Sequence, residues 1–96
     1  MLLVEQDGPI RRITLNRPEV RNAFNDELIV RLAEAMTEAG GDDAVRAVVI
    51  AGTGKVFCAG ADLNWMLKAA QYGPEENRAD ALAMSGLFHA ITDCPK

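Results

Sequence analysis

The feature that most constrains the fold is a short apolar run in the middle of the chain. Residues 46–51 read Arg-Ala-Val-Val-Ile-Ala, and the turn-forming sequence Gly52-Thr53-Gly54-Lys55 follows directly. A continuous β-branched run is typical of a strand that is buried on both faces, which requires a sheet covered by helices. The sequence therefore favours an α/β fold.

The flanking segments supply the other elements. Residues 2–6 and 10–16 alternate as strands do, around the turn Asp7-Gly8-Pro9, and predict a hairpin that Pro18 ends. A first helix is expected to begin after Asn25, an N-cap residue, and to end at Gly40-Gly41. The order of elements is then completed by a short helix over 62–70 and a long one from 74 to about 94. The long helix carries an apolar stripe at helical spacing: Ala79, Leu82, Ala83, Gly86, Leu87, Ala90 and Ile91.

Composition and charge exclude several classes of protein. With 49% hydrophobic residues, 25% charged residues and a formal net charge of −4, the chain is expected to fold. It has no apolar run near the roughly 18 residues of a membrane span and no basic segment typical of a secretory signal. Two cysteines are too few for a disulfide framework, so a cytoplasmic location is expected. The acidic balance disfavours a nucleic-acid partner, because a protein that binds nucleic acid needs a basic surface.

Small residues gather where the central strand gives way to the short helix, in Phe57-Cys58-Ala59-Gly60-Ala61-Asp62-Leu63. At such a junction backbone N–H groups can point at a ligand, and the helix dipole favours negative charge. One arm of an oxyanion hole would suit this position. The alternative is that Gly60 and Ala61 only permit a tight turn, with Asp62 as the helix cap. The residues alone leave both interpretations open.

Two motifs in this order resemble the enoyl-CoA hydratase/isomerase (crotonase) superfamily. They are Asn16-Arg17-Pro18-Glu19-Val20-Arg21-Asn22-Ala23-Phe24 and the segment 57–63, separated by a helix and the strand 46–51. The resemblance covers nearly the whole chain and implies the N-terminal portion, residues 1–96, of a single crotonase-like domain with an incomplete ββα spiral fold. The stretch Gly60 to Met66 further resembles the methylglutaconyl-CoA hydratase branch.

The resemblance also implies roles for individual residues. The backbone N–H of Ala61 would be the first oxyanion-hole donor to the thioester oxygen of an acyl-CoA. Around it, the site would be lined by Ala59, Asp62 and Leu63, and the CoA moiety would lie along Val20, Arg21 and Ala23.

The two arginines and the asparagine of the first motif have alternative roles. Arg21 would lie near the CoA phosphates, whereas Arg17 and Asn22 would hold the loop between strand and helix. A solvated loop position is the alternative for Arg17 and Arg21.

The implied reaction is the addition of water to an α,β-unsaturated acyl-CoA, with CoA as part of the substrate and no metal or redox cofactor. The implied assembly is a trimer-based homo-oligomer. In the family, the second N–H donor and a pair of glutamates follow beyond residue 96, so the isolated chain is expected to be inactive. Alternatives are another crotonase-type reaction (an isomerase or a hydrolase), a non-catalytic acyl-CoA-binding or interaction module, and RNA binding, which the acidic balance disfavours.

Other chemical groups match no motif. Gly54-Lys55 lacks the spacing of a phosphate loop, because Val49 and Val56 stand where Gly and Ser or Thr are needed. Trp65 and Met66 either wall an acyl pocket or pack the short helix. We expect surface or structural roles for the remaining candidates: Glu34, Glu38, Glu75, Glu76, Cys58 and His89.

Overall fold

A computed structural model describes residues 1–96, with one three-stranded sheet of order β1-β2-β3. The strands β1 (Leu2–Asp7) and β2 (Ile10–Leu15) form an antiparallel hairpin, and β3 (Ala47–Gly52) pairs with β2 in parallel. Gly8 makes the hairpin turn with a positive φ of 58°, a conformation that glycine adopts at little cost. The predicted hairpin and central strand are confirmed.

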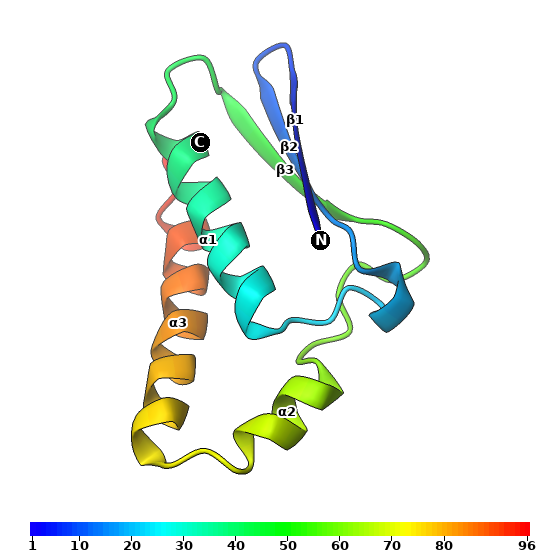
Figure 1. Cartoon of the computed structure of the whole chain (residues 1–96). Helices are drawn as coiled ribbons and strands as arrows, with labels where there is room; N and C mark the ends of the chain where they lie inside the picture. The colour runs from blue at the N-terminus through cyan, green and yellow to red at the C-terminus, as the bar shows by residue number, and fades with distance from the viewer.

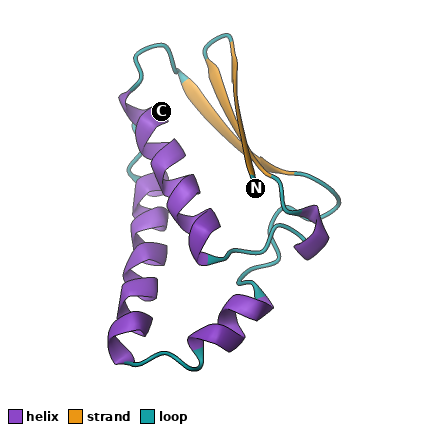
Figure 2. Ribbon diagram, in the orientation of Figure 1, coloured by secondary structure: helices purple, strands orange, loops and turns teal.

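The helices lie to one side of the sheet (Figures 1 and 2). The crossover between the two parallel strands is α1 (Asp26–Gly41), and α2 (Leu63–Ala69) and α3 (Pro74–Thr92) follow β3, with a 3-10 turn η1 (Pro18–Val20) before α1. This is the predicted order and the predicted mixed α/β class. None of these helices has the length and apolar character needed to cross a membrane.

The start of α1 is fixed as the sequence predicts. The Leu28 N–H donates to Oδ1 of Asn25 at 2.8 Å, which satisfies one of the free N–H groups of the first turn. At the other end, α1 extends through Gly41 and Asp42 follows in an extended conformation.

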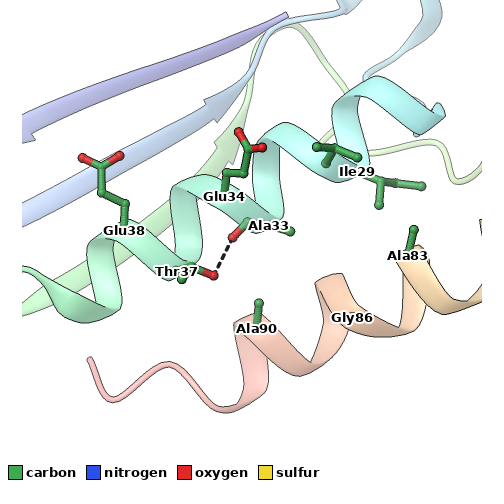
Figure 3. A pocket seen from close by; sticks show the side chains of 9 residues that line it. Ile29, Ala33, Glu34, Thr37, Glu38, Ala83, Gly86 and Ala90 are labelled. Atoms are coloured by element: carbon green, nitrogen blue, oxygen red, sulfur yellow. Dashed lines mark hydrogen bonds between the residues drawn. The ribbon is translucent and has the colours of Figure 1, made fainter.

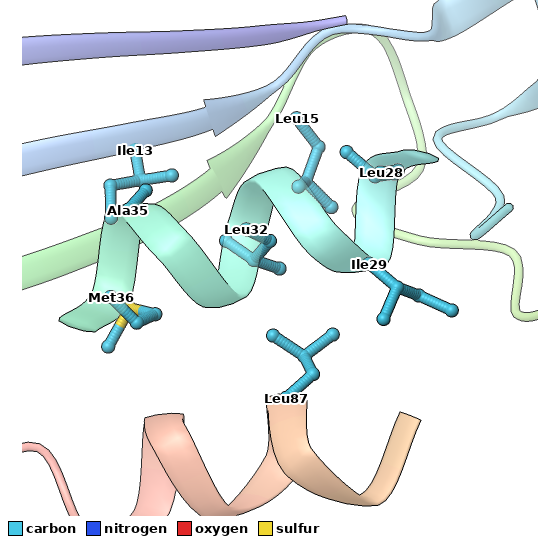
Figure 4. Packing of buried hydrophobic residues seen from close by; sticks show 8 residues of the cluster. All are labelled: Ile13, Leu15, Leu28, Ile29, Leu32, Ala35, Met36 and Leu87. Carbon is cyan, nitrogen blue, oxygen red and sulfur yellow. The ribbon is translucent and has the colours of Figure 1, made fainter. Parts of the chain in front are cut away.

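One hydrophobic cluster joins the sheet to both long helices (Figure 4). Its members come from one face of β2, from the inner face of α1 and from a single position of α3: Ile13, Leu15, Leu28, Ile29, Leu32, Ala35, Met36 and Leu87. Leu87 is fully buried and is the only buried residue of α3. Around it, the partly buried Met84, Ala90 and Ile91 of the same helix also pack against the cluster.

One expectation about burial is wrong. In β3, Val48 and Ile50 pack against the core, but Val49 on the opposite face is 37% exposed, because no element covers that face. In α3, most of the apolar stripe is uncovered, and Leu82 is 62% exposed. The first turns of α3 extend past the N-terminal end of α1, so α1 does not cover them (Figure 1).

Candidate functional site

Two loops meet at the edge of the sheet where the parallel strands β2 and β3 end. The chain after β2 reaches Phe24 and the chain after β3 reaches Ala61, and these residues form an isolated parallel bridge. The Phe24 N–H donates to the Gly60 carbonyl and the Phe24 carbonyl accepts from the Asp62 N–H, both at 2.6 Å. The two sequence motifs, far apart along the chain, are thus joined directly.

The bridge leaves the Ala61 N–H free. In a parallel bridge the residue flanked on both sides by its partner's bonds points its own N–H the other way. Ala61 has no hydrogen bond from its N–H to the backbone or to a side chain, and the residue is exposed. Gly60 precedes it with a φ of 95°, in the region that favours glycine. The junction therefore offers an unpaired donor held in place by its neighbours.

Asn22 ties the two loops together. Its side chain is fully buried, and its Oδ1 accepts from the Arg17 N–H at 2.8 Å. Its Nδ2 donates to the carbonyls of Thr53 and Val56 at 2.8 and 2.9 Å. A Cβ on Gly52 would lie 2.9 Å from this Nδ2 and 2.6 Å from a backbone oxygen, so a glycine is required there.

The same loop holds two successive non-glycine residues in the left-handed region, Arg21 at φ 55° and Asn22 at φ 58°. That conformation costs roughly 1–2 kcal/mol per residue, although asparagine tolerates it better than most. The turn directs the Arg21 carbonyl to the N–H of Ala59, which donates to it at 3.0 Å. The strained turn is thus bonded directly to the segment that carries Ala61.

Arg17 and Asp62 form the third tie. Arg17 Nη2 donates to Asp62 Oδ2 at 3.0 Å and Nη1 donates to the Ala23 carbonyl at 2.6 Å, with both charged side chains largely buried. The other Asp62 oxygen accepts from the Trp65 N–H at 3.1 Å and so caps α2. Hence the predicted cap is confirmed, and a solvated position for Arg17 is wrong. We call Arg17, Asn22 and Asp62 the loop cluster.

The charge on Asp62 is stabilised by these partners. The pKa of its carboxyl is lowered from the ordinary value of 3.8, chiefly by the hydrogen bond from the Trp65 N–H. Burial opposes this shift, and the bond from Arg17 adds to it. Both carboxylate oxygens are occupied, so Asp62 serves the loop geometry.

The remaining predicted site residues surround this junction. Arg21 is exposed and lines a hollow of about 420 Å³ together with Lys55, so that two cations share one concave surface. Ala23 is buried and its carbonyl is bound by Arg17. The others lie around the bridge with varying exposure: Val20, half-buried in η1, and Ala59 and Leu63, both exposed.

Sequence reasoning missed Lys55 as a partner of Arg21. Its position in the turn just after the central strand is a signal for such a role, although the spacing around it matches no phosphate loop. The bonds of the two loops bring Lys55 to the same hollow as Arg21.

A second hollow, of about 320 Å³, opens between α2 and α3 and includes Ala61 in its lining. It is lined by Ala61, by Trp65 and Met66 of α2, and by Asp80 and Met84 of α3, among others. We call it the α2–α3 hollow. No sequence pattern indicates Asp80, because its place in this lining depends on how α2 and α3 lie in space.

The largest hollow is elsewhere. A groove of about 600 Å³ runs between α1 and α3, over small residues such as Ala33, Ala83 and Gly86 (Figure 3). None of the predicted site residues lines it. Glu34 and Glu38 stand at this groove as exposed side chains, as predicted. The largest groove and the predicted site are therefore separate places on the molecule.

The other candidates have ordinary surroundings. Cys58 and Cys94 are free and half-buried, and the Cys58 thiol lies 3.9 Å from the Gly60 carbonyl. His89, Glu75 and Glu76 are exposed. No three His, Cys, Asp or Glu side chains come together in a group that could hold a metal ion.

Solved structures with this architecture are similar over almost the whole chain. A structure of an enoyl-CoA hydratase from Shewanella pealeana matches with a TM-score of 0.95 and 30% identity, over 99% of this chain and 36% of its own. Pseudomonas aeruginosa AtuE matches with a TM-score of 0.93 and 35% identity, over 99% and 37%.

Relatives by sequence agree with the structures. A Thermus thermophilus protein with enoyl-CoA hydratase in its name is 40% identical over 96 residues, which is 100% of this chain and 38% of the relative. The 1,2-epoxyphenylacetyl-CoA isomerase of Escherichia coli is 47% identical over 63 residues, 66% of this chain and 24% of that enzyme. The chain thus spans well under half the length of these relatives. The enoyl-CoA hydratase/isomerase family matches residues 5–96, and the chain belongs to that family.

Proposed function

We propose that this chain is the acyl-CoA-binding part of an enoyl-CoA hydratase-like lyase, which adds water to an α,β-unsaturated acyl-CoA. The observation that carries the proposal is the unpaired N–H of Ala61, held between Gly60 and Asp62 by the bridge to Phe24. An exposed donor fixed by its neighbours suits a thioester oxygen on which negative charge develops. Such a donor is effective because it needs no reorganisation when the charge appears.

The hydration can be written around that donor. The oxygen of water bonds to the β-carbon, one water proton is removed, and a proton is delivered to the α-carbon while the thioester oxygen carries the enolate charge. One oxyanion-hole donor contributes about 3 kcal/mol to such a reaction. A second donor and an acid/base pair must supply the rest. We therefore propose that the isolated chain binds acyl-CoA without turning it over.

The CoA moiety would lie along Val20, Arg21 and Ala23, with Ala59, Asp62 and Leu63 around the thioester. Arg21 and Lys55 support this orientation, because their hollow concentrates positive charge on an otherwise acidic chain. Phosphates of CoA would be attracted there. CoA enters as part of the substrate. Hydration changes no net oxidation state, so it needs no redox cofactor, and the group proposed to stabilise the thioester oxygen is an N–H and not a metal ion.

The identity of the acyl group and the type of reaction are two narrower proposals. The segment Gly60 to Met66 supports methylglutaconyl-CoA as a candidate substrate. The Escherichia coli relative is named an isomerase, which supports isomerisation of an acyl-CoA as the second candidate reaction. Both would use the Ala61 donor.

The binding proposal can be tested on the chain itself. Trp65 is the only tryptophan and lines the α2–α3 hollow beside Ala61, so its fluorescence should change when crotonyl-CoA is added. Ala61→Pro removes the N–H and should weaken binding about tenfold, the effect of one lost hydrogen bond. Ala61→Gly retains the N–H and should bind like the original chain.

A measurement that needs no variant guards against misfolding of Ala61→Pro. The infrared carbonyl stretch of an isotope-labelled thioester should move to lower frequency when it accepts the Ala61 N–H. Crotonyl-CoA that binds no better than free CoA, or with an unshifted carbonyl, would refute the role of Ala61.

We also propose a cytoplasmic, trimer-based homo-oligomer for the longer parent protein. The uncovered faces of β3 and α3 support further packing, because exposed apolar side chains such as Val49 and Leu82 gain from burial. Light scattering on the parent should give three or a multiple of three copies, and a monomer would contradict the proposal.

A further inference from the structure

The groove between α1 and α3, which we call the α1–α3 groove, has an apolar lining made mostly of small residues. Six of its lining residues are apolar or glycine: Ile29, Val30, Ala33, Ala83, Gly86 and Ala90. Ala83 and Ala90 point from α3 toward α1 (Figure 3). A Cβ on Gly86 would meet no atom within 4 Å. The groove therefore offers about 600 Å³ of space beside apolar side chains that the chain itself does not fill.

The charges at this groove are acidic. Glu34 and Glu38 line it, whereas no Lys or Arg does. A neighbouring hollow shares Val30 and Glu34 with the groove, and its one cation, Arg31, is already paired with Glu27. An occupant that carries a positive charge beside an apolar face would therefore complement the groove.

Helix α2 exposes a surface of this kind. Leu63 and Leu67 are one helical turn apart and are 68% and 61% exposed, and Met66 beside them is 53% exposed. Lys68 follows Leu67, is exposed and forms no ion pair. The seven residues of α2 extend about 10 Å, which is also the length of the α3 side of the groove. In shape and charge α2 thus suits the groove.

We propose that α2 of one copy of this chain docks in the α1–α3 groove of a second copy. Leu67 would occupy the space over Gly86, and Lys68 would lie beside Glu34. The contact must join two molecules, because within one chain α2 and α3 enclose the α2–α3 hollow, on a different side of α3 from the groove. This contact goes beyond the proposed function, since it needs no acyl-CoA.

The contact joins two unlike surfaces. One copy contributes its groove and the other contributes its α2, so every pair still has a free groove and a free α2. Further copies can therefore add head to tail or close into a ring. Because the contact area is small, we expect a Kd on the order of 100 μM and an average mass that rises with concentration.

Analytical ultracentrifugation of the chain, from about a tenth to about ten times that Kd, tests the contact. Gly86→Leu fills the groove and should weaken association at least tenfold. The position has room for the side chain, and leucine favours a helix more than glycine does, so the fold should be kept. Leu67→Asp places a negative charge on the exposed side of α2 and should weaken association as much from the other surface.

Two variants on α3 are the matched controls. Ser85→Leu adds the same side chain one residue before Gly86, outside the groove lining. Phe88→Asp replaces an apolar side chain that is 53% exposed, also outside the lining, by an acidic one. Both should associate like the original chain.

A mixture of the two defective chains tests the pairing of groove and helix directly. The Leu67→Asp chain keeps an intact groove, and the Gly86→Leu chain keeps an intact α2. The mixture should therefore form one-to-one pairs and nothing larger, although each chain alone stays monomeric.

A charge reversal tests the placement of Lys68. Lys68→Glu should weaken association about threefold, and the addition of Glu34→Lys to the same chain should restore it. Neither side chain has an ion pair or hydrogen bond within the chain to lose. If the double variant associates no better than Lys68→Glu, the placement of Lys68 beside Glu34 is refuted.

Three results would refute the contact itself. They are a chain that stays monomeric at the highest concentration, a Gly86→Leu or Leu67→Asp chain that associates as strongly as the original, and a mixture of these two chains that stays monomeric. Binding of crotonyl-CoA is measured separately through Trp65 fluorescence, far below the Kd for association, where the chain is a monomer. The docking contact and the acyl-CoA function can therefore each fail without the other.

Discussion

Ala61 stands between two regions that are built in different ways. The loop cluster behind it is buried, and its polar side chains are paired: Asn22 makes three hydrogen bonds, and both oxygens of Asp62 have partners. The α2–α3 hollow beside it is lined mainly by apolar residues, and two buried polar atoms of its lining residues, Trp65 Nε1 and Asp80 Oδ2, have no hydrogen-bond partner. Hydrogen bonds from several residues therefore fix the backbone that presents the Ala61 N–H, whereas the lining of the α2–α3 hollow has no comparable set of bonds.

The difference teaches which region fixes the backbone around Ala61 and which region leaves room for variation. An oxyanion donor must be held within a fraction of an ångström, and paired, buried side chains provide that precision. The first turns of α3, which carry Asp80, lie away from Leu87, the one fully buried residue of that helix. Substitutions in one region should therefore change stability and donor geometry, and substitutions in the other should change selectivity.

The largest effect is expected from Asn22→Ala. It leaves the Arg17 N–H and two carbonyls without their partner and puts alanine at a φ of 58°. The expected loss is about 4 kcal/mol in the free energy of unfolding, from the unpaired groups and the left-handed backbone together. Urea denaturation followed by circular dichroism measures it.

Asn22→Gly separates the two contributions, because glycine keeps the backbone conformation but not the hydrogen bonds. It should lose about 3 kcal/mol. Asn64→Ala, an exposed asparagine without a side-chain hydrogen bond, is the control and should change stability by no more than about 0.5 kcal/mol. Equal stability of Asn22→Ala and Asn64→Ala would show that the loop cluster does not hold the junction.

Leu87→Ala tests the attachment of α3. The side chain is fully buried between α3 and α1, so its truncation should cost about 3 kcal/mol through lost burial and the cavity that remains. Leu82→Ala removes the same atoms at a position that is 62% exposed on the same helix, and should cost no more than about 0.5 kcal/mol. Thermal and urea unfolding of both variants would compare them, and similar losses would show that Leu87 is not the main anchor of α3.

Much of the fold could be predicted because local signals and packing agree. Asn25 is a strong N-cap, the hairpin turn contains Gly8, and Pro74 opens α3, so the element order followed from the sequence. Burial could not be predicted in the same way. Val49 and Leu82 are apolar and could be buried, but only the arrangement of the neighbouring elements decides whether anything covers them.

The residues of the candidate site show the same difference between local signals and tertiary arrangement. The resemblance indicated the loop between strand and helix, and the structural roles it implied for Arg17 and Asn22 match the observed bonds. The place of Asp80 beside Trp65 in the lining of the α2–α3 hollow could not be predicted, because it depends on how two helices lie in space. Local motifs predict the loop cluster, and only the tertiary arrangement shows the hollow.

The smallest expected effect concerns pH and sharpens the account of the loop cluster. Because the pKa of Asp62 is lowered in the folded chain, the folded state binds the proton of this carboxyl less readily than the unfolded state does. Its contribution to stability should be complete above the ordinary value of 3.8 and should be lost as the pH falls through the lowered value. Asp62→Asn keeps an oxygen for the Trp65 N–H but not the charge opposite Arg17, so it should be less stable than the original chain at pH 7 and approach it in strong acid. Asp43→Asn removes the same formal charge at an exposed position outside the cluster and should show no such convergence. If the difference in the free energy of unfolding between Asp62→Asn and the original chain is the same at every pH, packing around Asp62 and not its charge supports the backbone at Ala61.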